Sequence, residues 1–231
     1  MKLAYVDIEA RWNIEDPVKG PPHNKEAEQR AKNIAEATGI PCEKVNYWDF
    51  SIEWMKEHGI EGFVISGNTP DWVEYDWELF KPLQAALTSG DYPVLGVCGG
   101  HQFIGMTFGA PAEAMSALQP GEVDLMPEYH PGMRKEKGWI PLQVSEPEST
   151  LFEGFPETGP VVMESHYWEI KELPEGFKLL ASTDFCEIQV MQHQDMPIVG
   201  IQGHPEAYNE QNPDGKQFIH NWAVATGLIP E

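Results

Sequence analysis

Cysteine and basic residues are scarce in this sequence, and long apolar runs are absent. Cys42, Cys98 and Cys186 are odd in number and show no metal-ligand spacing, so a reducing cytoplasm is the simplest setting. Only 15 basic residues face 37 acidic ones, and the net charge of −22 argues against nucleic acid or an anionic membrane as a partner. Met1–Ile8 lacks a signal-peptide core, and no run approaches membrane length. We therefore expect a cytoplasmic protein.

The order of apolar runs and helical patterns predicts an α/β fold. A chain of 231 residues has room for one large domain, and we expect residues 1–231 to form a single one. Residues 111–160 are interrupted by Pro, Gly and acidic residues, which favours a small antiparallel insertion at the sheet edge. The expected strands are 3–8, 45–47, 62–65, 94–97, 177–182, 187–192 and 198–202, and the expected helices include 26–38, 52–58, 99–108 and 216–226.

Cys98 stands between a predicted strand and a predicted helix. Val94–Val97 is short and apolar, and the apolar pattern of Gly99–Phe108 is typical of a helix. Gly96 and Gly100 allow a tight turn and leave room beside the sulfur. The arrangement follows the logic of a nucleophile elbow, and the nearby helix N-terminus favours a thiolate. For Cys98 taken alone, a buried core thiol is the alternative.

A second motif follows the predicted strand Ile198–Gln202. His204 and Glu206 lie two residues apart on a loop that Pro205 restricts. A cysteine nucleophile needs such a pair, since the imidazole transfers the proton and the carboxylate fixes the ring. The alternative for this motif alone is a surface turn.

Together the two motifs resemble a known family. Gly96–Gln102, which reads Gly-Val-Cys-Gly-Gly-His-Gln, and His204-Pro205-Glu206 are similar to the two signatures of the class I (triad) glutamine amidotransferase superfamily, which includes the glutaminase domain of GMP synthetase. Leu173–Phe177 and Leu180–Thr183 resemble the segment before the last strands of such domains. The resemblance implies a mostly parallel, flavodoxin-like sheet flanked by helices, with a small antiparallel edge insertion. It implies no cofactor and no metal.

The loop after the strand 62–65 is a candidate for half of an oxyanion hole. Backbone N–H groups of Gly67 or Asn68, together with that of Gly99, are the expected donors to a tetrahedral intermediate. The family usually has Ser-Gly-Gly or Ser-Gly-Ser here. Asn68 departs from this pattern, but Asn tolerates left-handed backbone angles. The alternative is a simple turn.

The expected substrate-binding residues are assigned through the resemblance. Gln102 and the pair Ser165-His166 would position the glutamyl head, because Ser165-His166 is similar to the start of the family segment Ser-His-Gly-Asp. Tyr167 and Trp168 replace Gly-Asp, so the wall of the pocket is reshaped and Tyr167 is expected to contact the substrate. The family also commonly has an aromatic residue where Gly203 stands.

Three further groups of residues have open interpretations. Arg11, Trp12 and His23 lie in an expected long loop and are either substrate-selecting or ordinary surface residues. One or two of the aromatic residues in Trp72–Trp77 are expected to wall the pocket. His130 has no ligand-spaced partner, and we interpret it as a surface histidine.

The resemblance implies glutaminase activity, with Cys98, His204 and Glu206 as a catalytic triad forming a thioester intermediate. The ammonia would pass to a separate synthetase. The alternative is a free-standing γ-glutamyl hydrolase or peptidase acting on γ-glutamyl amines or peptides, which needs no partner. An inactive binding or regulatory protein is a third alternative, which the presence of all three triad residues disfavours.

Overall fold

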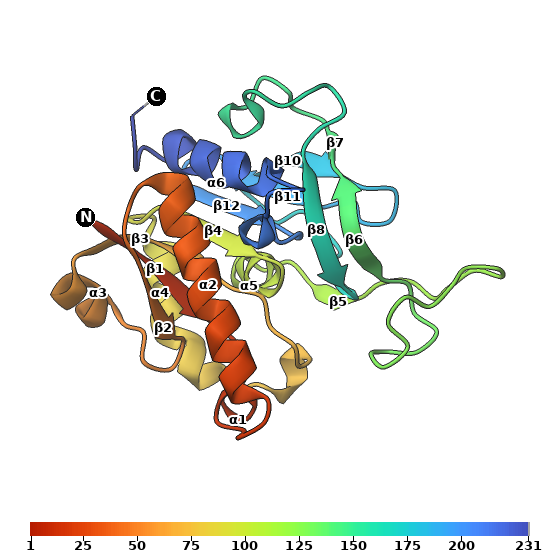
Figure 1. The fold of residues 1–231 in the computed structure, drawn as a ribbon, viewed down its shortest axis with the longest axis horizontal. Coiled ribbons are helices and arrows are strands. Elements are labelled where there is room, and N and C mark those ends of the chain that lie inside the picture. Colours follow the sequence, from red (N-terminus) through yellow and green to blue (C-terminus); the bar gives the residue numbers. More distant parts are fainter. Residues whose placement is uncertain (231) are drawn as a thin grey trace.

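The computed structural model describes residues 1–230, which fold around an eight-stranded sheet (Figure 1). The strand order is β2-β1-β3-β4-β12-β11-β10-β7. The first five strands in this order run parallel to their neighbours, and the last three pair antiparallel. Their bounds are β1 Lys2–Asp7, β2 Cys42–Asn46, β3 Ile60–Ile65, β4 Val94–Val97, β7 Gln143–Val144, β10 Phe177–Ser182, β11 Val190–His193 and β12 Ile198–Ile201. The predicted fold class is confirmed.

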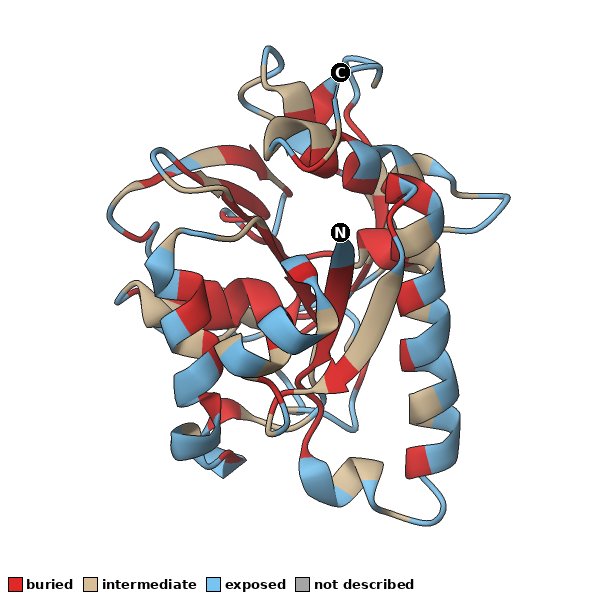
Figure 2. Ribbon diagram, turned by 90° about the vertical axis from the view of Figure 1, so that its left-hand side faces the viewer, coloured by how far each residue is buried: buried red, intermediate tan, exposed pale blue. Residues whose placement is uncertain are grey.

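Helices cover both faces of the sheet and divide the core in two. Apolar residues of α2 and α6 pack on one face, and those of α3, α4 and α5 pack on the other. Figure 2 shows the resulting band of buried residues along the strands and the inward sides of the helices. Every residue of β4 and β12 is buried, as expected for central parallel strands. The helices are α2 Gly20–Thr38, α3 Ile52–His58, α4 Lys81–Ser89, α5 Gly99–Thr107 and α6 Asp214–Ala225.

The predicted antiparallel insertion is also present. Strand β6 (Glu136–Pro141) pairs with β8 (Val161–His166), and β5 (Ala112–Ala114) pairs with β9 (Trp168–Ile170). These pairs lie beside the large sheet, on the right in Figure 1. Residues 1–230 also contain four short 3₁₀ turns: η1 Trp72–Glu74, η2 Trp77–Phe80, η3 Thr150–Phe152 and η4 Pro205–Ala207.

The prediction of one long loop before the first helix was wrong. Arg11–Ile14 forms a short helix, α1, and α2 already begins at Gly20. Two prolines follow Gly20 in the first turn of α2, where a missing N–H and a fixed φ are tolerated. Among residues 1–230, no helix combines the length and the apolarity that crossing a membrane requires.

Candidate active site

Cys98 forms a strained turn between β4 and α5. Its backbone has φ 51° and ψ −108°, values that side-chain-bearing residues rarely adopt. The flanking glycines are needed for close packing: a Cβ on Gly96 would lie 2.5 Å from the carbonyl oxygen of Gly100, and one on Gly100 would collide with the carbonyl of Ile65. The predicted elbow is therefore present, with the unusual angles at the cysteine itself.

His204 approaches the sulfur from the loop after β12. If Gly67 carried a Cβ atom, that atom would lie 3.0 Å from Cε1 of His204 and 3.7 Å from Sγ of Cys98. The imidazole ring and the sulfur therefore lie close together, next to Gly67. The N–H of His204 donates to the carbonyl of Met163 at 2.7 Å, which ties this loop to β8. Nδ1 of His204 lies 2.9 Å from Oε1 of Glu206. The structure thus brings the three predicted triad residues together.

Cys98 and Glu206 are buried, His204 is partly exposed, and the charges of these groups shift the pKa values of His204 and Glu206. Burial opposes protonation of His204, but the charges of Cys98 and Glu206 outweigh it and raise the pKa of His204 well above its ordinary value. Burial likewise opposes ionisation of Glu206, but the neighbouring His204 and the Arg30 guanidinium lower its pKa. An imidazolium between two anionic groups is the arrangement needed to donate a proton to a leaving group.

The backbone nitrogens of the candidate oxyanion donors lie close together. Among residues 1–230, the N–H groups of Gly67 and Asn68 donate to no other group of the protein. Gly99 opens α5, so its N–H has no acceptor within the helix. A Cβ on Gly99 would lie 3.0 Å from the backbone nitrogen of Asn68. The two predicted halves of the oxyanion hole therefore lie side by side.

A cleft of about 250 Å³ opens above the sulfur. It extends from His204 and Glu206 to the first turns of α2, where His23 and Arg30 line it. A smaller recess of about 30 Å³ also borders Cys98; Trp72 and Trp168 line it, and His204 does not. Free space is therefore greater on the imidazole side of the sulfur.

Gln102 lines the small recess, but its amide is fully engaged by the protein. Its Oε1 accepts from Nε1 of Trp72 at 2.9 Å, and its Nε2 donates to the carbonyl of Trp168 at 3.0 Å and to Gln202 at 3.2 Å. Contact of Gln102 with substrate stays a prediction. The geometry shows that this side chain positions the two tryptophans that narrow the recess.

Ser165, His166 and Tyr167 form the wall opposite the elbow. Ser165 and Tyr167 line both cavities, whereas the ring of His166 is engaged by Glu136 and by the carbonyl of Trp168. Tyr167 donates its hydroxyl to Oδ1 of Asp71 at 3.0 Å. The predicted segment is thus at the site, with the ring of His166 held in a separate buried cluster.

Two residues of the site, Arg30 and Asp71, were not predicted from the sequence. Arg30 lies on α2 one turn after Glu26 and pairs with it, a spacing that also suits an ordinary surface pair. Asp71 accepts from Tyr167 and Trp168 and lies 2.7 Å from Nε2 of His130. Locally, Asp71 and Glu74 form only the capping box of η1, whereas the partners of Asp71 at the site are distant in the sequence.

The residues with open interpretations divide into those that line a cavity and those on the surface. His23 lines the cleft and pairs with buried Asp7 at 2.9 Å, whereas Trp12 is exposed and outside the cleft lining. Arg11 pairs with Glu15 on the surface. Trp72 walls the small recess, as predicted for one of the aromatic residues. His130 is more than a surface histidine, since its ring packs 5.1 Å from that of Tyr167.

Comparisons with known proteins place these features in context. The family model of glutamine amidotransferase class-I matches residues 23–226. The A subunit of the glutamine-hydrolysing GMP synthase of Thermoplasma volcanium is 32% identical over 171 residues, covering 74% of each chain. The A subunit of the glutamine-hydrolysing GMP synthase of Archaeoglobus fulgidus is 35% identical over 161 residues, covering 69% of this chain and 73% of the relative. A solved structure from Thermoplasma acidophilum, provisionally described as the same GMP synthase component, superimposes with a TM-score of 0.71 at 25% identity, covering 99% and 94% of the two chains.

Proposed function

This chain belongs to the glutamine amidotransferase class-I family, and from that premise we propose that it hydrolyses the side-chain amide of glutamine and releases ammonia for a separate synthetase. The observation that carries the proposal is the position of His204. Its ring lies beside the sulfur of Cys98 and 2.9 Å from Glu206, at a strained elbow with free backbone donors next to it. These are the groups that acyl transfer through a thioester requires.

The first half-reaction forms the thioester. The Cys98 thiolate attacks the amide carbon of glutamine, and the carbonyl oxygen becomes an oxyanion that the N–H groups of Gly67, Asn68 and Gly99 stabilise. His204, held protonated by its anionic neighbours, donates its proton to the amide nitrogen as the carbon–nitrogen bond breaks. Ammonia leaves and the glutamyl group remains on the sulfur.

The second half-reaction releases glutamate. His204, now neutral, takes a proton from a water molecule that attacks the thioester carbonyl. The same backbone donors stabilise the second oxyanion, and the carbon–sulfur bond then breaks. Glu206 keeps the ring oriented and stabilises its charged form in both steps. The products are glutamate and ammonia, and Cys98 is again a thiolate beside a protonated His204.

The names of the relatives support a synthetase partner. The two archaeal relatives are each named as one lettered subunit of a glutamine-hydrolysing GMP synthase, which implies a further subunit in those proteins. By analogy, this chain would supply ammonia to a partner that aminates a purine nucleotide. Such a partner should raise the rate of ammonia release when it binds.

The reshaped wall keeps a second candidate open. Tyr167 and Trp168 occupy the place of Gly-Asp, and the larger cavity lies on the imidazole side, where the leaving amine would sit. This space would admit an amine larger than ammonia, as in γ-glutamyl amines or peptides. A free-standing γ-glutamyl hydrolase would use the same triad without a partner.

Ammonia or amine release across a panel of glutamine and γ-glutamyl amides tests both candidates. Cys98→Ala should lower every rate by about 10⁴-fold or more, whereas Cys42→Ala, which removes a thiol far from the elbow in sequence, should not. Full activity in Cys98→Ala would contradict the triad. Low activity on glutamine that rises with an added synthetase supports the amidotransferase, and strong activity of the chain alone on larger amides supports the hydrolase.

A further inference from the structure

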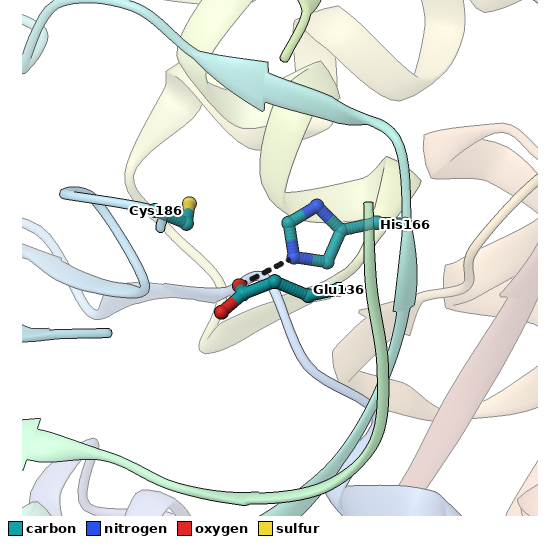
Figure 3. Close-up of side chains that lie close together, drawn as sticks. All are labelled: Glu136, His166 and Cys186. Carbon is teal, nitrogen blue, oxygen red and sulfur yellow. Dashed lines mark hydrogen bonds and ion pairs between the residues drawn. The ribbon is translucent and has the colours of Figure 1, made fainter. Parts of the chain in front are cut away.

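Behind the wall of the cleft, the side chains of Glu136, His166 and Cys186 converge in a fully buried cluster (Figure 3). We propose that this cluster, together with Glu164, is a binding site for one Zn²⁺-type divalent ion. The site would be structural and separate from the triad. The sequence does not reveal it, because its members come from three separate segments with no ligand-like spacing.

The distances suit a small ion. The potential ligand atoms of Glu136, His166 and Cys186 all lie within 4.8 Å of one another. Nε2 of His166 is 3.0 Å from Oε2 of Glu136 and 3.4 Å from Oε2 of Glu164. Bonds of about 2.0–2.3 Å to a tetrahedral ion place neighbouring ligand atoms roughly 3.3–3.7 Å apart. Small shifts of these side chains would therefore complete the coordination.

The state of Glu164 points independently to a ligand. This side chain is fully buried, and neither carboxyl oxygen has a hydrogen-bond partner among the described residues. An unpartnered buried carboxyl group is costly, and native structures rarely leave one. A proton shared between His166 and Glu136 would give those two side chains a hydrogen bond, but Glu164 would still have no hydrogen-bond partner. A cation bound by Glu136 and His166 would also attract Glu164, whose Oε2 lies 3.4 Å from Nε2 of His166.

The surrounding contacts prepare the ligands. Nδ1 of His166 donates to the carbonyl of Trp168 at 2.9 Å, so the lone pair for a metal would be on Nε2, the nitrogen that faces the carboxylates. Glu136 accepts from Thr183 and from Gln189, each at 2.6 Å. Metal-binding histidines and carboxylates usually have such hydrogen bonds in their outer shell.

The donor set selects the class of ion. One imidazole, one thiolate and two carboxylates suit Zn²⁺ and its neighbours among the transition metals, whereas Mg²⁺ and Ca²⁺ prefer oxygen ligands alone. A surface cavity of about 220 Å³ reaches Glu136 and Thr183 and offers a path for the ion.

Binding would join two sheets. Glu136 begins β6 and His166 ends β8, in the small sheet, while Cys186 lies in the connection between β10 and β11 of the large sheet. Ser165 and Tyr167 flank His166 in the sequence, so the ion would also fix the wall of the cleft.

Metal titration of the full chain tests the proposal, with Cys98→Ala as the parent so that the catalytic thiol cannot contribute. After chelator treatment, one equivalent of Co²⁺ should produce the charge-transfer band of a single thiolate ligand. The band should vanish in Cys98→Ala/Cys186→Ala and persist in the matched control Cys98→Ala/Cys42→Ala. Affinity for Zn²⁺ should fall by about 100-fold or more without Cys186, and Glu164→Gln should weaken it in the same direction.

X-ray absorption of the Zn²⁺-loaded parent gives a second readout that needs no variant at the site. We expect one sulfur at about 2.3 Å and nitrogen or oxygen ligands at about 2.0–2.2 Å. Absence of stoichiometric binding, a shell without sulfur, or a thiolate band that survives removal of Cys186 would overturn the proposal. So would a band seen only in the protein that retains Cys98, because the ion would then bind at the triad.

Discussion

The two walls of the cleft are built in different ways. The wall that carries Cys98 and His204 comes from the carboxyl ends of central parallel strands, where steric contacts fix the backbone. The opposite wall, Ser165–Trp168, comes from an antiparallel insertion and is held by polar contacts to Asp71. In the proposed mechanism the first wall supplies the reacting groups, and the second wall shapes the space for substrate. A change in the first should therefore affect kcat, and a change in the second should affect KM.

The largest effect is expected for Glu206→Gln in the first wall. Loss of the carboxylate removes a group that orients His204 and raises its pKa, so ammonia release from glutamine should fall by about 10³-fold. Because the pKa of His204 falls, the imidazolium form should be lost at lower pH, and the alkaline limb of the pH–rate profile should move toward acid. Steady-state rates across pH measure both effects.

Glu36→Gln is the matched control, since Glu36 is an exposed partner of Lys216 on the surface. It should leave the rate and the profile unchanged. If Glu206→Gln raised KM while kcat and the pH profile stayed as they were, the division of labour between the walls would be wrong.

A smaller effect, on stability, is expected where the two walls touch. A Cβ on Gly203 would collide with Oε1 of Glu164 and lie 2.8 Å from Cγ2 of Val162. Gly203→Ala should lower the free energy of unfolding by about 1–3 kcal/mol through overpacking. Urea denaturation in the presence of a chelator measures it without a contribution from metal.

The double variant Gly203→Ala/Glu164→Ala tests the cause. Because Glu164→Ala removes the nearer of the two groups that collide and leaves Val162, the alanine at 203 should cost less in that background. Strict additivity of the two changes would show that Glu164 is not the source of the overpacking.

The next smaller effect is expected for Asp71→Ala, which removes the contacts that hold the second wall in place. Tyr167, Trp168 and His130 all lose a partner, so the wall loosens and KM for glutamine should rise by about 10-fold. The turnover number should change by less than about 3-fold, because the triad contacts remain. Tyr167→Phe removes only one of these hydrogen bonds and should have a smaller effect on KM. A fall in kcat larger than the rise in KM would break the comparison.

The difference between the walls also explains what could be predicted from the sequence. Cys98 and its glycines form a local pattern, because the steric demands of the elbow fall on neighbouring residues. The pair His204 and Glu206 is likewise local. Their meeting follows from two adjacent parallel strands, β4 and β12, whose carboxyl ends share one edge of the sheet.

The second wall could not be predicted in this way. Tyr167 bonds to Asp71 across 96 positions of the sequence, and Gln102 bonds to Gln202 across 100. Neither spacing has a period that a pattern could reveal. The start of α2 at Gly20 was missed for a different reason: prolines that usually indicate a loop occupy the first helical turn, where they are tolerated.

The smallest effect is expected at the far end of the first wall, where His23 pairs with buried Asp7. The hydrogen bond that His23 donates to Asp7 raises the pKa of His23 despite burial. Burial opposes ionisation of Asp7, but His23 and Lys44 outweigh it and lower the pKa of Asp7. The stabilisation from His23 is complete below its unfolded pKa of about 6.5 and is lost as pH rises through the folded value. That from Asp7 is present above about 3.9 and is lost as pH falls.

His23→Ala should therefore cost about 1 kcal/mol of unfolding free energy between roughly pH 4 and 6.5, and less at pH 9. Urea denaturation at pH 5.5 and pH 9 measures the difference. In an Asp7→Asn background the pH dependence of the substitution should shrink, because the hydrogen-bonded carboxylate is lost and only the weaker charge of Glu9 remains. An equal cost at both pH values would show that His23 acts through packing in the cleft, as the sterically fixed residues of this wall do, and not through charge.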